Sequence, residues 1–209
     1  MFLAIVIILS YFLGSIPTAY IFGKLYKKID IREHGSGNVG ATNTFRVLGK
    51  WPGIIVLSVD ILKGALAVVL LGDIFNFKGM FSRVLIGIAA VCGHNWTVFL
   101  EFKGGKGIAT SLGVLIGMAV KFPSLVPVLG ICIISWMVAL YFSHYISLSS
   151  MIAAFVLPLA MLVTNQPLEM IFLGAVFCIF VVYRHRSNIS RLIQGTEPQS
   201  SFLKIQKKG

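Results

Sequence analysis

Acidic residues are scarce in this chain of 209 residues: seven aspartates and glutamates stand against 18 lysines and arginines. Charged residues of both signs make up only 12% of the sequence, about half of the roughly 25% typical of soluble domains. The three cysteines, Cys92, Cys132 and Cys178, are odd in number and lie in apolar segments, which excludes a disulfide framework and a cysteine metal site. No polar stretch is long enough to form a separate soluble domain.

Apolar runs dominate what is present. Hydrophobic residues make up 57% of the chain and the mean hydropathy is +0.90, values typical of a polytopic membrane protein. We therefore expect an all-α membrane helix bundle with about seven transmembrane helices, forming a single integral-membrane domain over residues 1–209. The expected spans are residues 1–23, 53–71, 84–100, 108–120, 125–142, 151–163 and 168–183.

Three of these spans need comment. The first lacks a basic leading region and a small-residue cleavage site, so we expect it to be retained and not removed as a signal peptide. Residues 108–120 and 151–163 are short for a hydrocarbon core of roughly 30 Å, which needs about 20 helical residues. They are expected to extend into their flanks, to tilt little or to be half-buried.

The basic residues of the loops predict the orientation. With the N-terminus outside, fourteen lysines and arginines fall on one side of the membrane, and only Lys78, Arg83 and Lys121 fall on the other. Because cytoplasmic loops carry the excess of basic residues, the C-terminus is expected to be cytoplasmic. A basic cytoplasmic face suits anionic lipid headgroups or an anionic substrate, so nucleic acid is not expected as a partner. Polar residues gather there in four segments, residues 34–46, 102–110, 145–150 and 184–197.

The segment 34–46 is rich in glycine and small polar residues. Its glycines allow tight turns, and Ser36 could cap a following helix whose first amides point at an anion. On that helix, Asn43 and Arg46 share one face at positions i and i+3. We expect a phosphate site here; the alternative is a capped re-entrant helix whose arginine only touches lipid phosphate.

A basic glycine loop, Lys103-Gly104-Gly105-Lys106-Gly107, separates two apolar segments. Its glycines can present consecutive backbone amides to an anion, some of them with positive φ, and its lysines add charge. The spacing differs from that of a nucleotide P-loop, so ATP is not implied. Anchoring of a span end by lysine is the alternative, but the density of glycine and lysine favours phosphate.

The segment 184–197 follows the last expected span. If the helix continues from that span, His185, Asn188 and Arg191 rotate through a sector of about 120° and can face one pocket. Gly195 is then expected to end the helix. A solvated basic amphipathic end is the alternative.

Other polar residues lie within or beside the spans. Ser147 and Ser150 either cap the sixth span or line the pocket. Asp60 and Lys63 are one turn apart in the second span, where an unpaired charge would cost roughly 2.5–3.5 kcal/mol, so we expect a structural ion pair. His94, near the inner end of the third span, is expected to be a hydrogen-bonded packing residue; the alternative is that it reaches the pocket.

Together these residues resemble the bacterial acyl-phosphate:glycerol-3-phosphate acyltransferases of the PlsY type over nearly the whole chain. Four blocks carry the resemblance: Gly-Ser-Gly-Asn-Val-Gly-Ala-Thr-Asn at 35–43 followed by Arg46; Gly93-His94 leading into Phe-Lys-Gly-Gly-Lys-Gly-Ile-Ala-Thr at 102–110; Ser-Leu-Ser-Ser at 147–150; and His185, Asn188 and Arg191, closing with Gly195 and Glu197. One departure is Thr97, where the family often has proline.

The resemblance implies that the chain makes lysophosphatidic acid from glycerol 3-phosphate and a long-chain acyl phosphate, at the cytoplasmic face of the bacterial inner membrane. It implies no acyl-CoA, no cofactor and no metal ion. The catalytic residues that it implies are Ser36, Arg46, His185 and Asn188. Substrate binding is implied for Asn43, Lys103, Gly104, Gly105, Lys106, Gly107, Ser147, Ser150 and Arg191, and a structural role for Glu197.

The chemistry of an acyl phosphate suits such a site. This mixed anhydride is already activated, so no acyl-enzyme is needed. The protein must hold two anionic substrates and stabilise the charge on the departing phosphate, which amides, arginine and lysine can do. The proton of the attacking glycerol hydroxyl can pass to His185 or to a phosphate oxygen of the donor.

Absent patterns argue against several rivals. No histidine is followed five positions later by aspartate, so the His-x4-Asp arrangement of acyl-CoA-dependent glycerolipid acyltransferases is missing. Asp30, Glu33, Glu101 and Glu197 are too scattered for the divalent-metal site of a CDP-alcohol phosphotransferase. An organic-phosphate transporter, or another membrane transferase of phospholipid synthesis, is the alternative function. Polar motifs at one membrane face and the lack of an inverted repeat favour the enzyme over the transporter.

Overall fold

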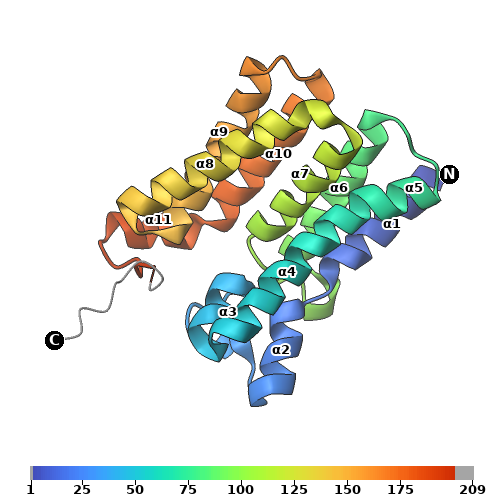
Figure 1. Ribbon diagram of the computed structural model, residues 1–209. Coiled ribbons are helices and arrows are strands. Elements are labelled where there is room, and N and C mark those ends of the chain that lie inside the picture. Colours follow the sequence, from blue (N-terminus) through green and yellow to red (C-terminus); the bar gives the residue numbers. More distant parts are fainter. Residues whose placement is uncertain (1, 201–209) are drawn as a thin grey trace. The chain divides into compact units, whose positions relative to one another are not determined.

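The computed structural model describes residues 2–200, and within them the chain forms helices and loops but no strand, which confirms the all-α expectation. The chain divides into two compact units, one ending at Leu125 and one beginning at Val126. Each is described by itself below, and Figure 1 labels the helices of both. That the whole chain acts as one acyltransferase domain stays a prediction.

Over residues 2–125, the first unit contains seven α-helices and four short helical segments. The α-helices are α1 (Phe2–Ser15), α2 (Thr18–Lys27), α3 (Ala41–Leu48), α4 (Lys50–Leu66), α5 (Gly72–Ile74), α6 (Met80–Asn95) and α7 (Ile108–Lys121). A π-helical segment, η2 (Ala67–Leu71), joins α4 to α5, and the 3₁₀ segments are η1 (Ile31–Glu33), η3 (Val98–Leu100) and η4 (Pro123–Leu125). The main packing pairs are α1 with α6 and α4 with α7, which run side by side in Figure 1.

Glycines allow these helix pairs to approach closely. A Cβ atom on Gly14 of α1 would overlap the carbonyl oxygen of Ala90 in α6. Likewise, a Cβ atom on Gly113 of α7 would overlap the carbonyl oxygen of Ile61 in α4. Small residues at such crossings are typical of membrane helices, because packing and not the hydrophobic effect holds those helices together.

A buried arginine of α6 supports the π-helical segment. Arg83 is 4% exposed and donates from Nη1 to the carbonyl oxygen of Val68 at 2.6 Å and from Nη2 to Asp73 Oδ1 at 2.5 Å. Lys121 pairs with the other oxygen of Asp73. Two of the three basic residues expected on the outer side are therefore paired with one carboxylate, which leaves little unpaired positive charge there.

The second unit is built from α8 (Val126–Ser143), α9 (Ile146–Val163), α10 (Leu168–Arg184) and α11 (Arg186–Ile193), with α9 packed against both α8 and α10. The expectation that the last span continues as a straight helix is wrong, because α10 and α11 meet at a bend of 58°. At the bend, Nδ1 of His185 lies 2.8 Å from the carbonyl oxygen of Val181, which also accepts the backbone N–H of His185. Side-chain bonds to the helix's own carbonyls compete with regular helix.

Five helical segments among residues 2–200 are long and apolar enough to cross a bilayer. They are Phe2–Lys27, Lys50–Ile74, Met80–Leu100, Pro123–Ser143 and Ile146–Val163, and the bent pair α10 and α11 makes a sixth if it counts as one span. The sixth expected span does extend into its flank, since α9 begins at Ile146. Helix α7 has 14 residues and is about 21 Å long, short of the roughly 30 Å core. The count of seven and the orientation of the termini stay predictions.

Candidate functional site

Asn43 organises the loop that precedes α3. Its Oδ1 accepts the backbone N–H of Ser36 at 2.8 Å, and its Nδ2 donates to the carbonyl oxygens of Ile31 and His34 at 3.3 and 3.0 Å. The residue is 1% exposed, so its amide is engaged by the protein's own backbone. The geometry therefore favours a loop-positioning role for Asn43 over the predicted contact with substrate, which stays untested.

Ser36 does not cap α3, so that expectation is wrong. The helix begins at Ala41 with Gly40 at its N-cap, and no side chain caps it. The loop reaches this start through Gly35 and Gly37, whose φ values of 63° and 70° favour glycine and carry the chain past Ser36. Ser36 is left exposed on the loop, where its hydroxyl can meet a ligand but cannot reach the first turn of the helix.

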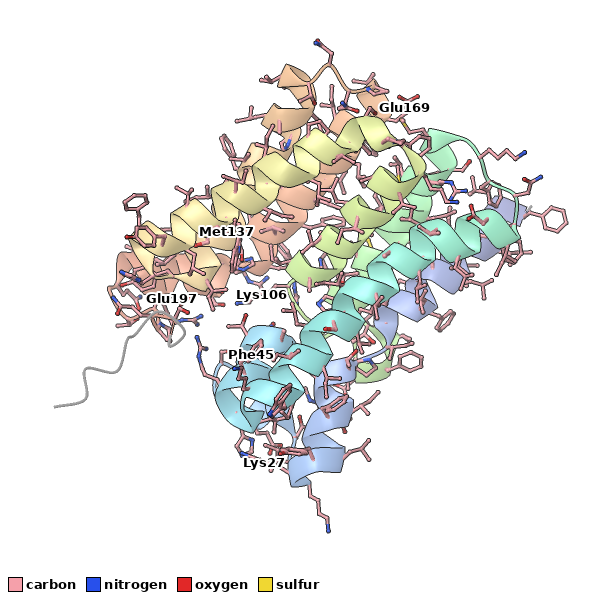
Figure 2. The ribbon with its side chains drawn as sticks, in the orientation of Figure 1. Lys27, Phe45, Lys106, Met137, Glu169 and Glu197 are labelled. Atoms are coloured by element: carbon pink, nitrogen blue, oxygen red, sulfur yellow. The ribbon has the colours of Figure 1, made fainter. Side chains whose placement is uncertain are left out.

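Arg46 is the exposed cation of α3. Its neighbour Phe45, labelled in Figure 2, packs on α4 so closely that a Cβ atom on Gly53 would overlap the phenyl ring. Among residues 2–200, the side chain of Arg46 makes no hydrogen bond or ion pair. An arginine on an anchored helix with no partner in the described chain can offer its planar fork to a phosphate.

The glycine loop folds back onto the end of α6. The N–H of Gly104 donates to the carbonyl oxygen of Asn95 at 3.2 Å, and the N–H of Gly105 donates to that of His94 at 2.9 Å. The prediction that these two amides point at an anion is therefore wrong, because they hold the loop in place. What the loop presents is Lys103, Lys106 and the start of α7, where Gly107 is the N-cap and no side chain caps the helix.

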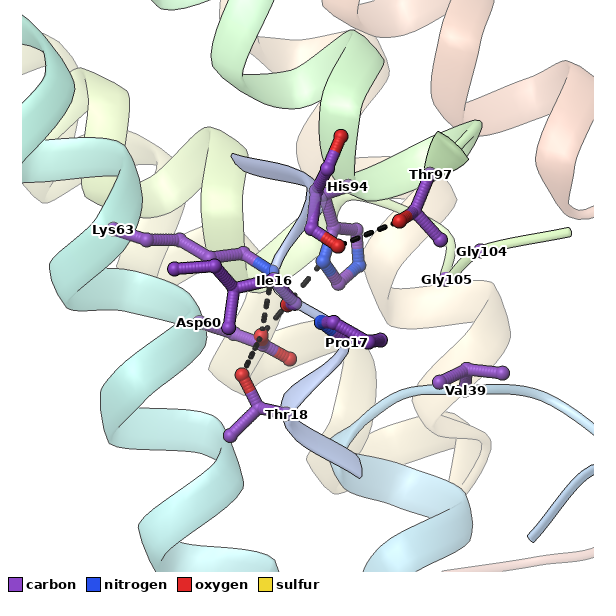
Figure 3. Close-up of a pocket in the computed structure, with 11 residues that line it drawn as sticks. Ile16, Pro17, Thr18, Val39, Asp60, Lys63, His94, Thr97, Gly104 and Gly105 are labelled. Atoms are coloured by element: carbon purple, nitrogen blue, oxygen red, sulfur yellow. Dashed lines mark hydrogen bonds and ion pairs between the residues drawn. The ribbon is translucent and has the colours of Figure 1, made fainter. Parts of the chain in front are cut away.

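Space, and not backbone conformation, explains two of the loop glycines. A Cβ atom on Gly104 would overlap the carbonyl oxygen of His94, and one on Gly105 would overlap the His94 ring at Nε2 and lie 3.0 Å from the carbonyl oxygen of Val39. Of the three glycines in this loop, only Gly107 has a left-handed φ, at 83°. The contact with Val39 brings the glycine loop against the segment 34–46, as Figure 3 shows.

Beneath the loop lies a buried polar group in which the expected pair of Asp60 and Lys63 is present, with Nζ 2.9 Å from Oδ1. Lys63 Nζ also donates to the carbonyl oxygen of Ile16 at 3.1 Å, in the short non-helical link between α1 and α2. Thr18 Oγ1 donates to Asp60 Oδ1 at 3.3 Å. Nothing in the sequence pointed to Thr18, because its partner is 42 residues away and the threonine sits in an apolar run.

Thr97 stands where the resembled family often has proline, and it keeps the bend. Its φ of −68° is close to the value that a proline ring imposes. The hydroxyl donates to the carbonyl oxygen of Ser15 at 2.6 Å and accepts the N–H of Phe99 at 3.3 Å. The threonine therefore joins the end of α1 to the start of η3, a link that proline could not form.

In the second unit, one carboxylate collects the polar residues of two helices. Glu197, labelled in Figure 2, is 8% exposed. Its Oε1 accepts from Ser147 Oγ of α9 and from Asn188 Nδ2 of α11, both at 2.6 Å, and its Oε2 accepts from Arg191 Nε at 2.8 Å. This geometry favours the structural role expected for Glu197.

The turn after α11 explains how Glu197 reaches its partners. Gly195, with φ at 68°, follows the helix as expected. The N–H of Gly195 donates to the carbonyl oxygen of Leu192 at 3.2 Å, and that of Thr196 to Arg191 at 2.8 Å. This pair of bonds is a Schellman motif, which reverses the chain and returns the glutamate to the helix that it follows.

Two further predicted residues of this unit are buried. His185 is 3% exposed, and because a carbonyl oxygen can only accept, its bond to Val181 places a proton on Nδ1 and makes Nε2 the basic nitrogen of the neutral ring. Ser150 is 3% exposed, donates to the carbonyl oxygen of Ile146 at 2.8 Å and accepts from Trp136 Nε1 at 3.3 Å. No side chain caps α9, so capping by Ser147 or Ser150 is wrong.

We expect Glu197→Gln to lower the apparent melting temperature at pH 7 by roughly 5 °C. Burial raises the pKa of the Glu197 carboxyl, but the hydrogen bonds from Ser147, Asn188 and Arg191 outweigh it, and the pKa lies below the ordinary 4.5. A carboxyl group with a lowered pKa stabilises the folded state at pH values above its ordinary pKa. This contribution is lost as the pH falls through the lowered pKa. The gap between variant and wild type should therefore narrow only below pH 4.5. The control is Glu169→Gln at an exposed site of α10, and equal melting temperatures for wild type and Glu197→Gln would contradict the role.

Comparison with known proteins gives a consistent result. Residues 4–195 match the family described as "Glycerol-3-phosphate acyltransferase". The glycerol-3-phosphate acyltransferase of Prochlorococcus marinus is 48% identical, over 95% of this chain and 98% of that protein. The corresponding protein of Fusobacterium nucleatum is 41% identical, over 94% of this chain and 97% of its own length.

Solved structures agree. The chain is similar to crystal structures of PlsY (YgiH), an integral membrane glycerol 3-phosphate acyltransferase, with 36% identity to each of two forms. The TM-score is 0.86 for the glycerol 3-phosphate form, over 97% of this chain and 98% of that one. It is 0.81 for the lysophosphatidic acid form, over 94% of both. With its apolar helices, the chain is a multi-pass membrane protein.

Proposed function

The chain belongs to the glycerol-3-phosphate acyltransferase family, and on this premise we propose that it transfers a fatty acyl group from acyl phosphate to glycerol 3-phosphate. The products are lysophosphatidic acid and inorganic phosphate, in the first acylation step of phospholipid synthesis. The reaction takes place at the cytoplasmic face of the bacterial inner membrane and uses neither a cofactor nor a metal ion.

One observation supports the proposed reaction in addition to the family membership. In the first unit the glycine loop lies against Val39 of the segment 34–46, which also bears the exposed residues Ser36 and Arg46. A guanidinium, a hydroxyl, two lysines and an uncapped helix start therefore belong to two segments that touch. Such groups bind phosphate, which the donor and the acceptor both carry. A similar protein, 36% identical, has been crystallised in a glycerol 3-phosphate form.

The bond changes need little from the protein. A hydroxyl oxygen of glycerol 3-phosphate attacks the acyl carbon, a new ester C–O bond forms, and the C–O bond to the donor's phosphate breaks. The electron pair of that bond leaves with the phosphate. Arg46 and the lysines of the glycine loop stabilise the negative charge that collects there. No enzyme nucleophile takes part, because the mixed anhydride is already activated.

The hydroxyl proton has two acceptors in this scheme. One is Nε2 of His185, the basic nitrogen of the neutral ring, and the other is an oxygen of the departing phosphate. Asn188 and Arg191 follow this histidine on α11 and are held by Glu197. Within the second unit these polar groups are preorganised, and the proposal assigns Asn188 to catalysis and Arg191 to substrate binding.

Donor specificity tests the proposed reaction. Purified protein in detergent with a metal chelator is supplied with labelled glycerol 3-phosphate and, in separate reactions, acyl phosphate, acyl-CoA or acylated acyl carrier protein. We expect labelled lysophosphatidic acid with acyl phosphate only. Equal activity with acyl-CoA, or loss of activity on chelation, would contradict the proposal. A transporter would instead move glycerol 3-phosphate into proteoliposomes without consuming a donor.

A further inference from the structure

A buried polar group lies directly under the glycine loop of the first unit, and we propose that it makes His94 a positioning residue for the phosphate site. In this arrangement the imidazole, which lies between the Asp60–Lys63 pair and the loop, sets where Gly105 and the rest of the loop lie. The kinetic part of the proposal rests on the proposed function, whereas the contact itself can be tested without any activity.

The His94 support, as we call Asp60, Lys63 and His94, is buried on all sides. The three residues are 2%, 4% and 7% exposed. Nδ1 of His94 lies 3.7 Å from Asp60 Oδ1, the same oxygen that pairs with Lys63 Nζ at 2.9 Å. In Figure 3 the imidazole stands between this ion pair and the glycine loop.

The ion pair is itself fixed by contacts from the link between α1 and α2 and from the start of α2. The carbonyl oxygen of Ile16, at the break between α1 and α2, accepts from Lys63 Nζ, and Thr18 Oγ1 donates to Asp60. A buried ion pair adds little stability over apolar residues of the same volume, because desolvation offsets the attraction between the charges. The role of this pair is therefore geometric, because its bonds to Ile16 and Thr18 fix the position of the carboxylate that His94 faces.

The other side of the His94 ring determines the position of the loop. Its Nε2 occupies the place that a Cβ atom on Gly105 would take, so ring and backbone are in direct contact. The carbonyl of the same histidine accepts the N–H of Gly105 at 2.9 Å. Because the Val39 carbonyl would lie 3.0 Å from that Cβ, Gly105 is confined between the ring and the segment 34–46.

Removal of the ring is expected to loosen the loop and weaken phosphate binding. We expect His94→Ala to raise the KM for glycerol 3-phosphate about tenfold, with less than a twofold change in the KM for acyl phosphate. His94→Asn keeps a polar group near the position of Nδ1 but lacks the atoms that touch Gly105, so it should behave like His94→Ala. The matched control is His144→Asn at an exposed histidine with φ of 60°, a backbone conformation that asparagine tolerates.

A double-mutant cycle isolates the contact. Gly105→Ala should be several-fold less damaging to KM in the His94→Ala background than in wild type, because the overlap with the ring is gone. Gly104→Ala is the internal control, because its Cβ would overlap the backbone carbonyl oxygen of residue 94. The His94→Ala substitution does not remove that oxygen. The effect of Gly104→Ala should therefore be the same in both backgrounds.

The same cycle is measured by apparent melting temperature, which needs no substrate. If the effects of Gly105→Ala and His94→Ala on the melting temperature are coupled, and those of Gly104→Ala and His94→Ala are not, the contact is supported whatever reaction the protein catalyses. Equal effects of Gly105→Ala in both backgrounds would overturn the contact. A wild-type KM for glycerol 3-phosphate in folded His94→Ala would overturn the positioning role, whereas absence of acyl transfer in wild type would overturn the proposed function alone.

Discussion

Replacement of Arg46 by lysine is expected to lower turnover about a hundredfold, the order seen when one donor to a developing negative charge is lost. The substitution keeps the positive charge but removes the planar fork that can bind two phosphate oxygens at once. Arg46 is exposed and has no partner among residues 2–200, so its replacement removes no internal bond. Folding and membrane insertion should therefore be normal.

The test compares turnover of Arg46→Lys with its melting temperature and its yield in membranes. Arg186→Lys is the matched control, because Arg186 lies over the ring of Tyr183 at 4.8 Å and has no assigned role in the reaction. Near wild-type turnover of Arg46→Lys would make this arginine a contact to lipid phosphate, the alternative that its segment also allows.

Gly104→Ala should raise the KM for glycerol 3-phosphate several-fold or more and leave that for acyl phosphate nearly unchanged. The added Cβ would overlap the carbonyl oxygen of His94 and push the loop, with its two lysines, away from α6. Charge in the site is unaltered, so the effect reports position alone. A two-substrate kinetic matrix on folded, inserted protein gives both constants.

The control for this glycine is Gly79→Ala, where a Cβ atom meets nothing within 4 Å. A rise confined to the KM for acyl phosphate would reverse the assignment of the loop to glycerol 3-phosphate. No change in either KM would indicate that Gly104 only forms the turn at the end of a span.

Features that depend on local rules could be predicted from the sequence. The apolar runs located the helices, the helix expected after Ser36 is present as α3, and Gly195 marked the end of α11. The pair of Asp60 and Lys63 followed from the cost of a lone charge in an apolar helix. Each of these inferences needs only neighbours within one or two turns.

Features that depend on distant contacts could not. Asn43 looked like a ligand because its amide is polar, but three backbone groups of the preceding loop engage it. The amides of Gly104 and Gly105 were predicted to bind an anion, but their hydrogen-bond acceptors are backbone carbonyls at the end of α6. Segments far apart in sequence also meet at Thr18 and Asp60, and no periodicity predicts which residues face each other there.

The fate of the donor's phosphorus tests the central claim most directly. Purified protein is given acyl phosphate labelled with ³²P and glycerol 3-phosphate labelled with ¹⁴C in its glycerol carbons, with no acyl-CoA or acyl carrier protein present. Direct acyl transfer predicts lysophosphatidic acid that carries ¹⁴C but no ³²P, and release of ³²P as inorganic phosphate in equal molar amount. Lipid labelled with ³²P, release of phosphate without lipid, or no product until acyl-CoA is added would contradict it.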